Sequence, residues 1–166
     1  MLFRSLYGYG GFLNSMTPFF AIAPLVWLEQ GGIYAVACLR GGGEYGEAWH
    51  QAGMLEQKQN VFDDFAARAK HLIDAGYTKQ SNLAIIGGSN GGLLMGAALV
   101  QHPDMFRAVV SFVGIYDMLR SEVTTPNAIF NITEFGSVKD AAQFRDRKST
   151  RLNSSHLKLS RMPSSA

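Results

Sequence analysis

Hydrophobic positions along this chain fall into two patterns, short apolar runs and longer stretches with helical spacing. The short runs are strand candidates at residues 2–7, 33–39, 82–86 and 107–114. The last three are almost continuously apolar and are bounded by glycines or turn residues, which is typical of strands buried on both faces. We therefore expect four strands, the last three of them buried.

Helical spacing is clearest at residues 60–75. Asn60 is the expected N-cap and Gly76 the expected stop. The apolar residues of this stretch would form one face of the helix, consisting of Val61, Phe62, Phe65, Ala69, Leu72 and Ile73.

Two other stretches also predict helices. Residues 17–30 predict one with Thr17 as N-cap, Pro18 at the first helical position and Gly31 just past its end. Residues 92–102 predict another, which Pro103 would stop.

Strands that alternate with helices indicate an α/β fold, a mostly parallel sheet with helices on both faces. The loops that leave three of the strands are rich in glycine, and they read YGYGGF (7–12), RGGGEYGE (40–47) and GGSNGG (87–92). In open α/β sheets, ligands bind at the carboxyl ends of the strands. All three glycine-rich loops should therefore open onto one edge of the sheet.

The composition places this pattern in a single globular domain followed by a short tail. The chain has 166 residues, of which 47% are hydrophobic and 17% charged, so a sizeable core is possible. The net charge of +2 comes from residues 148–166, which hold four of the fifteen Lys and Arg residues and no acidic residue. We expect a partial catalytic domain at residues 1–146. The Ser-rich, basic stretch 147–166 resembles translated sequencing-adapter read-through, and we expect it to be disordered or artefactual.

Several classes of protein receive no support from the composition. The basic charge belongs to the tail, so it does not indicate nucleic-acid binding. The apolar stretch at residues 19–28 is about half the ~20 residues that a membrane span needs, and it contains Pro24. The lone Cys38 is expected to be a small buried hydrophobic residue, and no metal or other cofactor is predicted. The start of the chain does not resemble a secretory signal, so a cytoplasmic location is the default expectation, with a periplasmic or secreted parent also possible.

The loop GGSNGG carries the strongest chemical signal in the sequence. It matches the nucleophile elbow G-x-S-x-G with Ser89 at the centre, between a predicted strand and a predicted helix. Small flanking residues are needed in such a turn because a Cβ would collide with the neighbouring strand or helix. The helix dipole behind the serine favours negative charge on an attacked carbonyl oxygen. A chance match in a glycine-rich chain is the competing interpretation.

Phosphate-binding loops are the rival readings of these glycines. GGSNGG lacks the Lys-Ser/Thr ending of a P-loop. Gly41, Gly43 and Gly46 match the dinucleotide pattern G-x-G-x-x-G, with Asp63 about 20 residues further on. Against this reading, Glu44 would face a pyrophosphate with like charge, no helix pattern starts directly after Gly46, and Asp63 lies in a predicted helix.

Taken in order, YGYGGF, RGGGEYGEAWH, KQNVFDDF, GYT, GGSNGGLL, HPDMF and YDML resemble the prolyl oligopeptidase family of serine peptidases. These motifs cover roughly residues 6–120. The resemblance implies an α/β-hydrolase fold, incomplete here because only the nucleophile half is present. The asparagine after the serine is more like the proline-cleaving members than the basic-residue-cleaving ones, which usually have alanine there.

The resemblance implies specific roles at the expected sheet edge. Ser89 would be the nucleophile, and the Asn90 backbone N–H and the Tyr9 hydroxyl would hold the oxyanion. Phe12 and Ile115 would line the apolar pocket for the residue before the cleaved bond. The family also has a pocket tryptophan after YDML. This sequence has none there, and Phe130 is the candidate substitute.

The remaining triad residues are the main departure from the family. In α/β-hydrolases the order along the chain is Ser, then Asp or Glu, then His. After Ser89 the histidines are His102, expected at a helix end, and His156, in the tail. Asp117 is expected to be structural. The triad Asp and His, and the β-propeller of the family, are expected to lie outside this sequence.

The expected function is therefore proteolysis of short peptides after proline, through an acyl-enzyme on Ser89. The present stretch is expected to be an inactive fragment of the parent enzyme. Two alternatives remain open. The parent could be an esterase or acyl hydrolase of the same fold, or the stretch could be a non-catalytic hydrolase-fold module.

Overall fold

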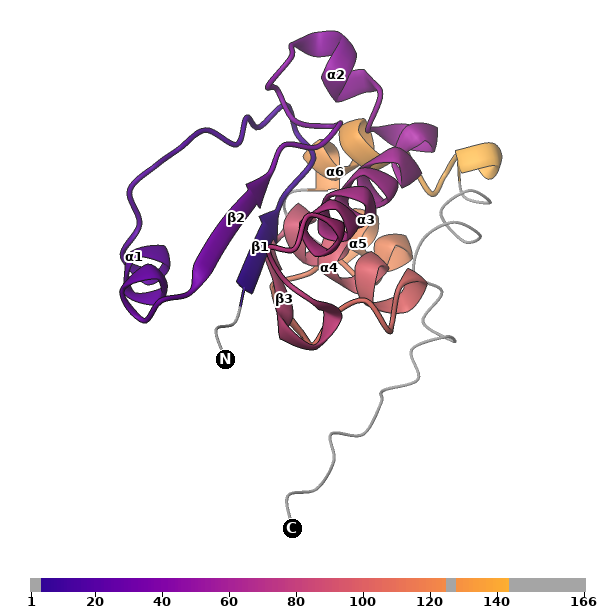
Figure 1. The fold of residues 1–166 in the computed structure, drawn as a ribbon. Helices are drawn as coiled ribbons and strands as arrows, with labels where there is room; N and C mark the ends of the chain where they lie inside the picture. The colour runs from indigo at the N-terminus through magenta and orange to yellow at the C-terminus, as the bar shows by residue number, and fades with distance from the viewer. Residues whose placement is uncertain (1–3, 125–127, 144–166) are drawn as a thin grey trace.

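A four-stranded parallel sheet forms the centre of the computed structural model, which describes residues 4–124 and 128–143. Its strands are β1 (Arg4–Gly8), β2 (Ile33–Ala37), β3 (Leu83–Gly88) and β4 (Ala108–Phe112). Their order across the sheet is β2-β1-β3-β4 (Figure 1). The four predicted strands and the parallel arrangement are confirmed.

The first strand lies inside the sheet and pairs on both sides. Leu6 of β1 is opposite Ala35 of β2 on one side and Ile85 of β3 on the other. The chain then leaves β3, crosses over and adds β4 beyond it, with Ile85 opposite Val109. Because all four strands run in the same direction, their carboxyl ends meet at one edge, and the three glycine-rich loops leave from that edge as predicted.

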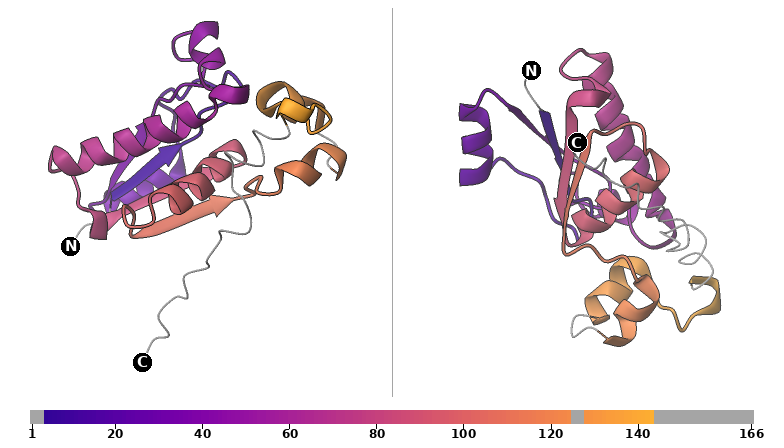
Figure 2. Two further views of the ribbon diagram at one scale, coloured as in Figure 1. Left: turned by 90° about the vertical axis from the view of Figure 1, so that its right-hand side faces the viewer. Right: turned by 90° about the horizontal axis from the view of Figure 1, so that it is seen from below.

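Helices cover the sheet unequally. The longer helices α3 (Gln59–Asp74) and α4 (Asn90–Gln101) pack against one face, whereas α1 (Ile22–Glu29) lies on the other (Figure 2). The helices α2 (Glu47–Gln51), α5 (Met118–Thr124) and α6 (Ala128–Phe135) lie towards the carboxyl ends of the strands. Two short 3₁₀ turns, η1 (Leu55–Gln57) and η2 (Gln80–Asn82), complete the described elements.

The hydrophobic core lies between the sheet and the pair α3 and α4. Side chains of the inner strands, including Leu6 and Ile85, meet Phe65 of α3 and Leu94 of α4, and all four are almost fully buried. The face predicted for α3 is confirmed: Val61, Phe62, Phe65 and Ala69 are buried, and Leu72 and Ile73 pack against the same cluster. This core fixes the ends of β1 and β3 relative to each other.

Two predicted helix starts are wrong. The first helix begins at Ile22 with Ala21 as its N-cap, so Thr17 is no cap and Pro18 lies in the preceding loop. Pro24 falls in the first turn, where its missing N–H costs no hydrogen bond. Helix α3 begins at Gln59. Asn60 therefore lies in the first turn of the helix and does not cap it. Its side-chain amide donates to the Ala52 carbonyl at 2.9 Å.

The predicted helix ends are confirmed. Gly31 follows α1 with φ 78°, and Gly76 follows α3 with φ 77°, the left-handed conformation in which glycine ends helices at little cost. Helix α4 ends at Gln101, with His102 at its C-cap and Pro103 behind it. In the part of the chain that the structure describes, every helix is too short or too polar to cross a membrane.

Burial of β2 and β4 on both faces is a wrong prediction. They are the outer strands of this sheet, and Val36 of β2 and Phe112 of β4 are exposed. A run of apolar residues shows that a strand is suited to burial, but the neighbouring segments decide whether it is buried. Cys38 is likewise only half-buried, with its thiol 3.8 Å from the Met16 carbonyl oxygen.

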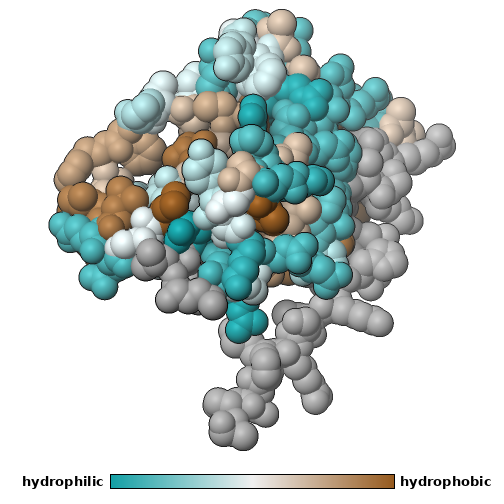
Figure 3. All heavy atoms as spheres, in the orientation of Figure 1, coloured by the Kyte–Doolittle hydropathy of each residue, from teal (hydrophilic) through white to brown (hydrophobic). Residues whose placement is uncertain are grey.

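Helix α1 adds a further exposed apolar surface. None of its residues is buried. Hydrophobic side chains gather at the left of the molecule over this helix and the loop before it (Figure 3). The larger exposed ones in that region are Phe19, Phe20, Ile22, Leu25, Val26 and Leu28.

Candidate active site

Ser89 occupies the turn between β3 and α4, where it is exposed to solvent. Its backbone has φ 57° and ψ −117°, a conformation that costs energy in any residue with a Cβ. The Ser89 N–H donates to the Phe112 carbonyl at 2.9 Å, and the Ser89 carbonyl accepts from the Leu93 N–H at 3.1 Å. The strained conformation is thus held from both sides, and it presents the hydroxyl at the open edge of the sheet.

Two of the surrounding glycines are required by close backbone approach. A Cβ on Gly87 would lie 2.5 Å from the Gly91 carbonyl oxygen, and one on Gly91 would lie 2.5 Å from the Gly8 carbonyl oxygen. These contacts are with backbone, which cannot rotate away as a side chain can. The start of α4 thus lies directly against the end of β1, and only glycine fits at these two positions, as the motif predicted.

Gly91→Ala is expected to lower the free energy of unfolding by about 1–3 kcal/mol, because its Cβ would overpack against backbone. Gly88→Ala is the matched control, since the nearest atoms to its Cβ lie 3.6 Å away, and we expect a change within about 0.5 kcal/mol. Urea unfolding followed by circular dichroism measures both. Equal stability of the two variants would show that the elbow has more room than the structure gives it.

Tyr9 and Asn90 flank Ser89. Tyr9 follows β1, and its side chain lies close enough to that of Ser89 for Ser89 to lower the pKa of its phenol. The buried Asn90 side chain donates from Nδ2 to the Tyr9 carbonyl at 2.6 Å, so it holds the backbone of the loop that carries Tyr9. The structure brings together the three residues that the sequence assigned to catalysis.

The electrostatics of this cluster favour a neutral Tyr9. Burial raises the pKa of the Tyr9 phenol above its ordinary value, and the charge of Glu134 raises it further, against the hydrogen bond from Ser89 that lowers it. The phenol therefore remains a hydrogen-bond donor at neutral pH. The N–H groups of the first turn of α4, which starts at Asn90, have no partner within the helix and add the positive end of its dipole. This arrangement can stabilise an oxyanion beside Ser89.

A buried ion pair that the sequence did not reveal lies beside the Tyr9 loop. Lys58 Nζ is 2.7 Å from Glu134 Oε1, and their side chains are only 1% and 2% exposed. Nζ also donates to the Gly10 carbonyl at 3.0 Å, and His50 Nε2 is 2.9 Å from Glu134 Oε2. A lysine at a helix start and a glutamate 76 residues later gave no periodic or motif signal.

The loop after β2 packs against the same region. Gly41 has φ 92°, and a Cβ there would lie 2.8 Å from the Gly10 carbonyl oxygen. One argument against a dinucleotide site is wrong, because α2 does begin directly after Gly46. The others stand, since Glu44 lies in the loop, with its carboxylate accepting from the Met16 N–H at 2.9 Å, and Asp63 lies in α3.

The three apolar residues assigned to substrate binding have different surroundings. Phe12 and Ile115 are partly buried and pack against the core. Phe12 makes an edge-to-face contact with Phe135, with ring centroids 5.6 Å apart. Phe130 is 65% exposed on α6, and it makes no ring contact with the other described aromatic residues. Phe135, which the sequence did not single out, is thus the aromatic residue that lies against Phe12.

The histidines of the described residues are engaged elsewhere or lie on the surface. His50 interacts with Glu134, His71 is exposed on α3, and His102 ends α4. In residues 4–124 and 128–143, no hydrogen bond joins a histidine side chain to Ser89. Asp117 accepts from the Arg120 N–H at 3.0 Å at the start of α5, which agrees with a structural role. His156 lies outside the described residues.

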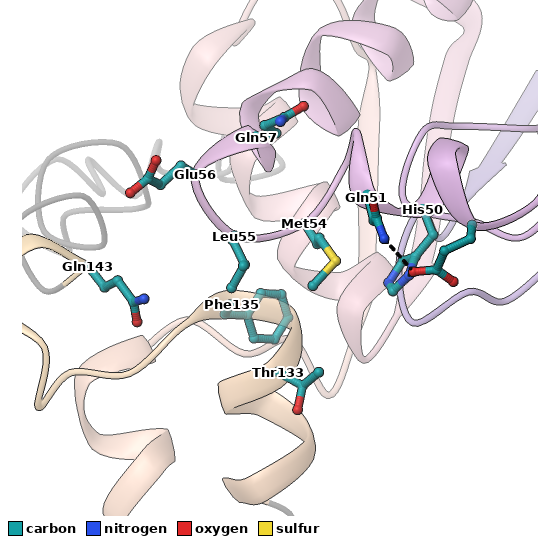
Figure 4. Close-up of a pocket in the computed structure, with 10 residues that line it drawn as sticks. His50, Gln51, Met54, Leu55, Glu56, Gln57, Thr133, Phe135 and Gln143 are labelled. Carbon is teal, nitrogen blue, oxygen red and sulfur yellow. Dashed lines mark hydrogen bonds and ion pairs between the residues drawn. The ribbon is translucent and has the colours of Figure 1, made fainter.

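One open pocket of about 630 Å³ lies between the α2 and η1 segment and α6 (Figure 4). His50, Met54, Leu55 and Phe135 are among its lining residues, whereas Ser89, Tyr9 and Asn90 are not. We therefore assign the chemistry to the exposed Ser89 edge and not to this pocket. Among the described residues, no group of three His, Cys, Asp or Glu side chains could hold a metal ion.

Comparison with known proteins gives matches over most of the chain. A family model described as the prolyl oligopeptidase family matches residues 19–159. The chain is 45% identical over 138 residues to a prolyl endopeptidase of Elizabethkingia miricola, a match that covers 83% of this chain and 19% of the relative. It is 54% identical over 119 residues to a prolyl endopeptidase of Dictyostelium discoideum, covering 71% of this chain and 16% of that one.

Comparison with solved structures gives matches to the same family. A solved structure from a study of two prolyl endopeptidases superimposes with a TM-score of 0.88 at 47% identity. The match covers 94% of this chain and 23% of that one. The architecture is therefore that of an α/β-hydrolase catalytic domain, and the chain spans about a fifth of the length of the curated relatives it matches.

Proposed function

This chain belongs to the prolyl oligopeptidase family of serine peptidases, and we propose that it carries the nucleophile of an enzyme that cleaves short peptides after proline. The observation that supports this most is the exposed Ser89, held at φ 57° at the carboxyl edge of the sheet, with the adjacent Asn90 side chain hydrogen-bonded to the Tyr9 carbonyl. Relatives of similar sequence are named prolyl endopeptidases, which favours a substrate with proline before the cleaved bond.

The proposed chemistry is acyl transfer in two steps. Ser89 Oγ attacks the peptide carbonyl carbon and loses its proton to a general base, and the carbonyl oxygen becomes an oxyanion. The Tyr9 hydroxyl and the Asn90 N–H donate hydrogen bonds to that oxyanion. The C–N bond then breaks, the amine leaves with the proton from the base, and an ester on Ser89 remains. Water, deprotonated by the same base, hydrolyses the ester and restores the hydroxyl.

Substrate selection would depend on apolar side chains near this edge. We propose that Phe12 and Ile115, which are partly buried against the core, contact the residue before the cleaved bond. Phe130, exposed on α6, would close the pocket only once a substrate or another segment covers it. We infer that these three residues together favour a compact apolar ring such as proline.

The base and its carboxylate partner are proposed to come from a further segment of the enzyme. In the α/β-hydrolase order, the acid and the histidine follow the serine on later loops. His50 interacts with Glu134, His102 lies at the C-cap of α4, and Asp117 accepts from the Arg120 N–H at the start of α5. A β-propeller that admits only short peptides is the other proposed partner, since this chain matches only 19% of the length of such a relative.

A chimaera tests this proposal. The matching 138-residue segment of the Elizabethkingia miricola prolyl endopeptidase would be replaced by the segment of this chain. We expect the chimaera to hydrolyse a short peptide after proline at least about 100-fold faster, in kcat/KM, than the same peptide with arginine at that position, a difference of roughly 3 kcal/mol. Release of a fluorogenic amine measures both rates.

The parent enzyme with its own segment is the control for assembly of the chimaera. Equal rates after proline and arginine would contradict the proposed specificity. Hydrolysis of esters without cleavage of any peptide would favour the acyl-hydrolase alternative. A folded chimaera that hydrolyses neither would favour a non-catalytic module.

A further inference from the structure

The Lys58–Glu134 ion pair is buried in the interior of the protein, where charged side chains are rare. Lys58 precedes α3, and Glu134 lies in the last turn of α6, so the pair joins two helices 76 residues apart. Both side chains are almost completely buried. Burying two charges costs desolvation energy that their attraction often fails to recover, so stability alone is a weak reason for such a pair.

The contacts of Lys58 point to a different role. Besides Glu134, the ammonium donates to the Gly10 carbonyl at 3.0 Å. It also lies 5.2 Å from the centroid of the Phe135 ring, in cation–π contact with it. The ammonium is thus fixed in place by Glu134 and fixes one backbone oxygen of the loop after β1.

That oxygen belongs to the residue next to Tyr9. The Tyr9 carbonyl accepts from Asn90 Nδ2 at 2.6 Å, and the following carbonyl, that of Gly10, accepts from Lys58. Gly11 is enclosed as well: a Cβ there would lie 2.5 Å from Asn90 Nδ2 and 2.8 Å from Glu134 Oε1. Consecutive peptide units around Tyr9 are therefore held from two sides, by the elbow and by the ion pair.

We propose that Lys58 and Glu134 are positioning residues that clamp the 9–11 loop and so aim the Tyr9 hydroxyl at the oxyanion formed beside Ser89. Neither residue touches substrate or reacting atoms in this proposal. His50 completes the clamp by holding the second carboxylate oxygen of Glu134 at 2.9 Å. The proposal rests on the proposed function for its catalytic meaning, but the clamp itself can be tested without activity.

The first test follows Tyr9 directly in the 166-residue chain. Tyrosine labelled with ¹³C at Cζ gives one signal per tyrosine, and Tyr9→Phe assigns the signal of Tyr9. In Lys58→Met/Glu134→Gln, which removes both charges at nearly constant shape, we expect that signal to move towards those of the exposed Tyr45 and Tyr77. We also expect amide hydrogen exchange of residues 9–11 to rise about tenfold or more as the loop opens locally.

The single variant Glu134→Gln gives a second, independent result. It keeps the Lys58 ammonium beside the Gly10 carbonyl but removes a negative charge that raises the pKa of Tyr9. The pKa of Tyr9 should therefore be lower in Glu134→Gln than in the wild-type chain. This variant remains informative if the double variant does not fold. A Tyr9 titration equal to that of the wild type, together with unchanged amide exchange of residues 9–11, would contradict the proposal.

Glu122→Gln is the matched control. Glu122 is also a buried carboxylate, but it binds Ser137 and the Val138 N–H and not the Tyr9 loop. We expect its Tyr9 signal and exchange rates to match the wild type. If the double variant is folded, as stable as this control and unchanged in both readouts, the clamp does not exist.

In the chimaera, the double substitution is expected to lower kcat by about 100-fold with little change in KM, because misplacing a transition-state donor by about 1 Å has an effect of that size. An unchanged kcat in a folded double variant would contradict the positioning role. If the unmodified chimaera is inactive, the proposed function fails, while the signals of Tyr9 and the exchange of its loop still decide whether the clamp exists.

Discussion

Ser89→Ala is expected to reduce turnover of the chimaera by about a million-fold, because loss of the nucleophile in a comparable triad has an effect of that size. The structure gives the physical reason: Ser89 alone occupies the exposed turn at φ 57° between β3 and α4. The remaining oxyanion donors would still bind substrate, so KM should change little. Hydrolysis of a fluorogenic proline peptide measures the loss.

Ser111→Ala is the matched control for this substitution. Ser111 lies one strand away at the same end of the sheet, where its hydroxyl donates to the Gly92 carbonyl at 3.3 Å. We expect this variant to keep activity within a fewfold of the unsubstituted chimaera. A fluorophosphonate should label a peptide containing Ser89 in the chimaera and in Ser111→Ala, but not in Ser89→Ala. If Ser89→Ala retained activity and the fluorophosphonate labelled a different residue, that residue would be the nucleophile.

The 166-residue chain by itself is expected to turn over about a million-fold more slowly than the chimaera, since removal of the base from a comparable triad costs about as much as removal of the whole triad. His50 interacts with Glu134, the partner of Lys58, and not with Ser89. The Ser89 hydroxyl therefore has no base in the described part of the chain.

A dipeptidyl-proline ester is the sensitive probe of this second prediction, because it acylates a serine more readily than a peptide does. No burst of product release should accompany its addition to the isolated chain. A burst that disappears in Ser89→Ala would contradict the prediction and would show that some group in these 166 residues activates the serine. His50→Ala and His102→Ala would then identify which group.

Local patterns along the chain were sufficient for the elements and for the elbow. Continuous apolar runs predicted β2, β3 and β4, and the flanking glycines predicted where α1 and α3 end. The elbow could be predicted because its requirement is local: a Cβ on Gly87 or Gly91 meets backbone of the adjoining turn or strand.

Features that depend on distant partners could not be predicted in this way. Asn60 was expected to cap α3, but its amide donates to Ala52, and only the folded loop brings those groups together. Val36 and Phe112 are exposed because no described segment covers these two side chains of the outer strands. The ion pair of Lys58 with Glu134 was missed for the same reason, since each residue alone resembles an ordinary surface charge.

The family resemblance supplied what the patterns left open. Periodicity and spacing gave no role for Tyr9, whereas the resemblance assigned its hydroxyl to the oxyanion. In the structure, the Tyr9 side chain lies close to that of Ser89, and the Tyr9 carbonyl accepts a hydrogen bond from the Asn90 side chain. This is the arrangement that the role needs.

The sequence separation within the Lys58–Glu134 pair also affects the order in which the site is made. A ribosome adding roughly 5–20 residues per second needs about 4–15 s to synthesise the 76 residues from Lys58 to Glu134. While the last 45 of these residues are made, Ser89 and Tyr9 already exist, but the carboxylate that holds the ammonium does not. If the pair clamps the loop as proposed, the oxyanion site of a nascent chain stays unformed until α6 emerges.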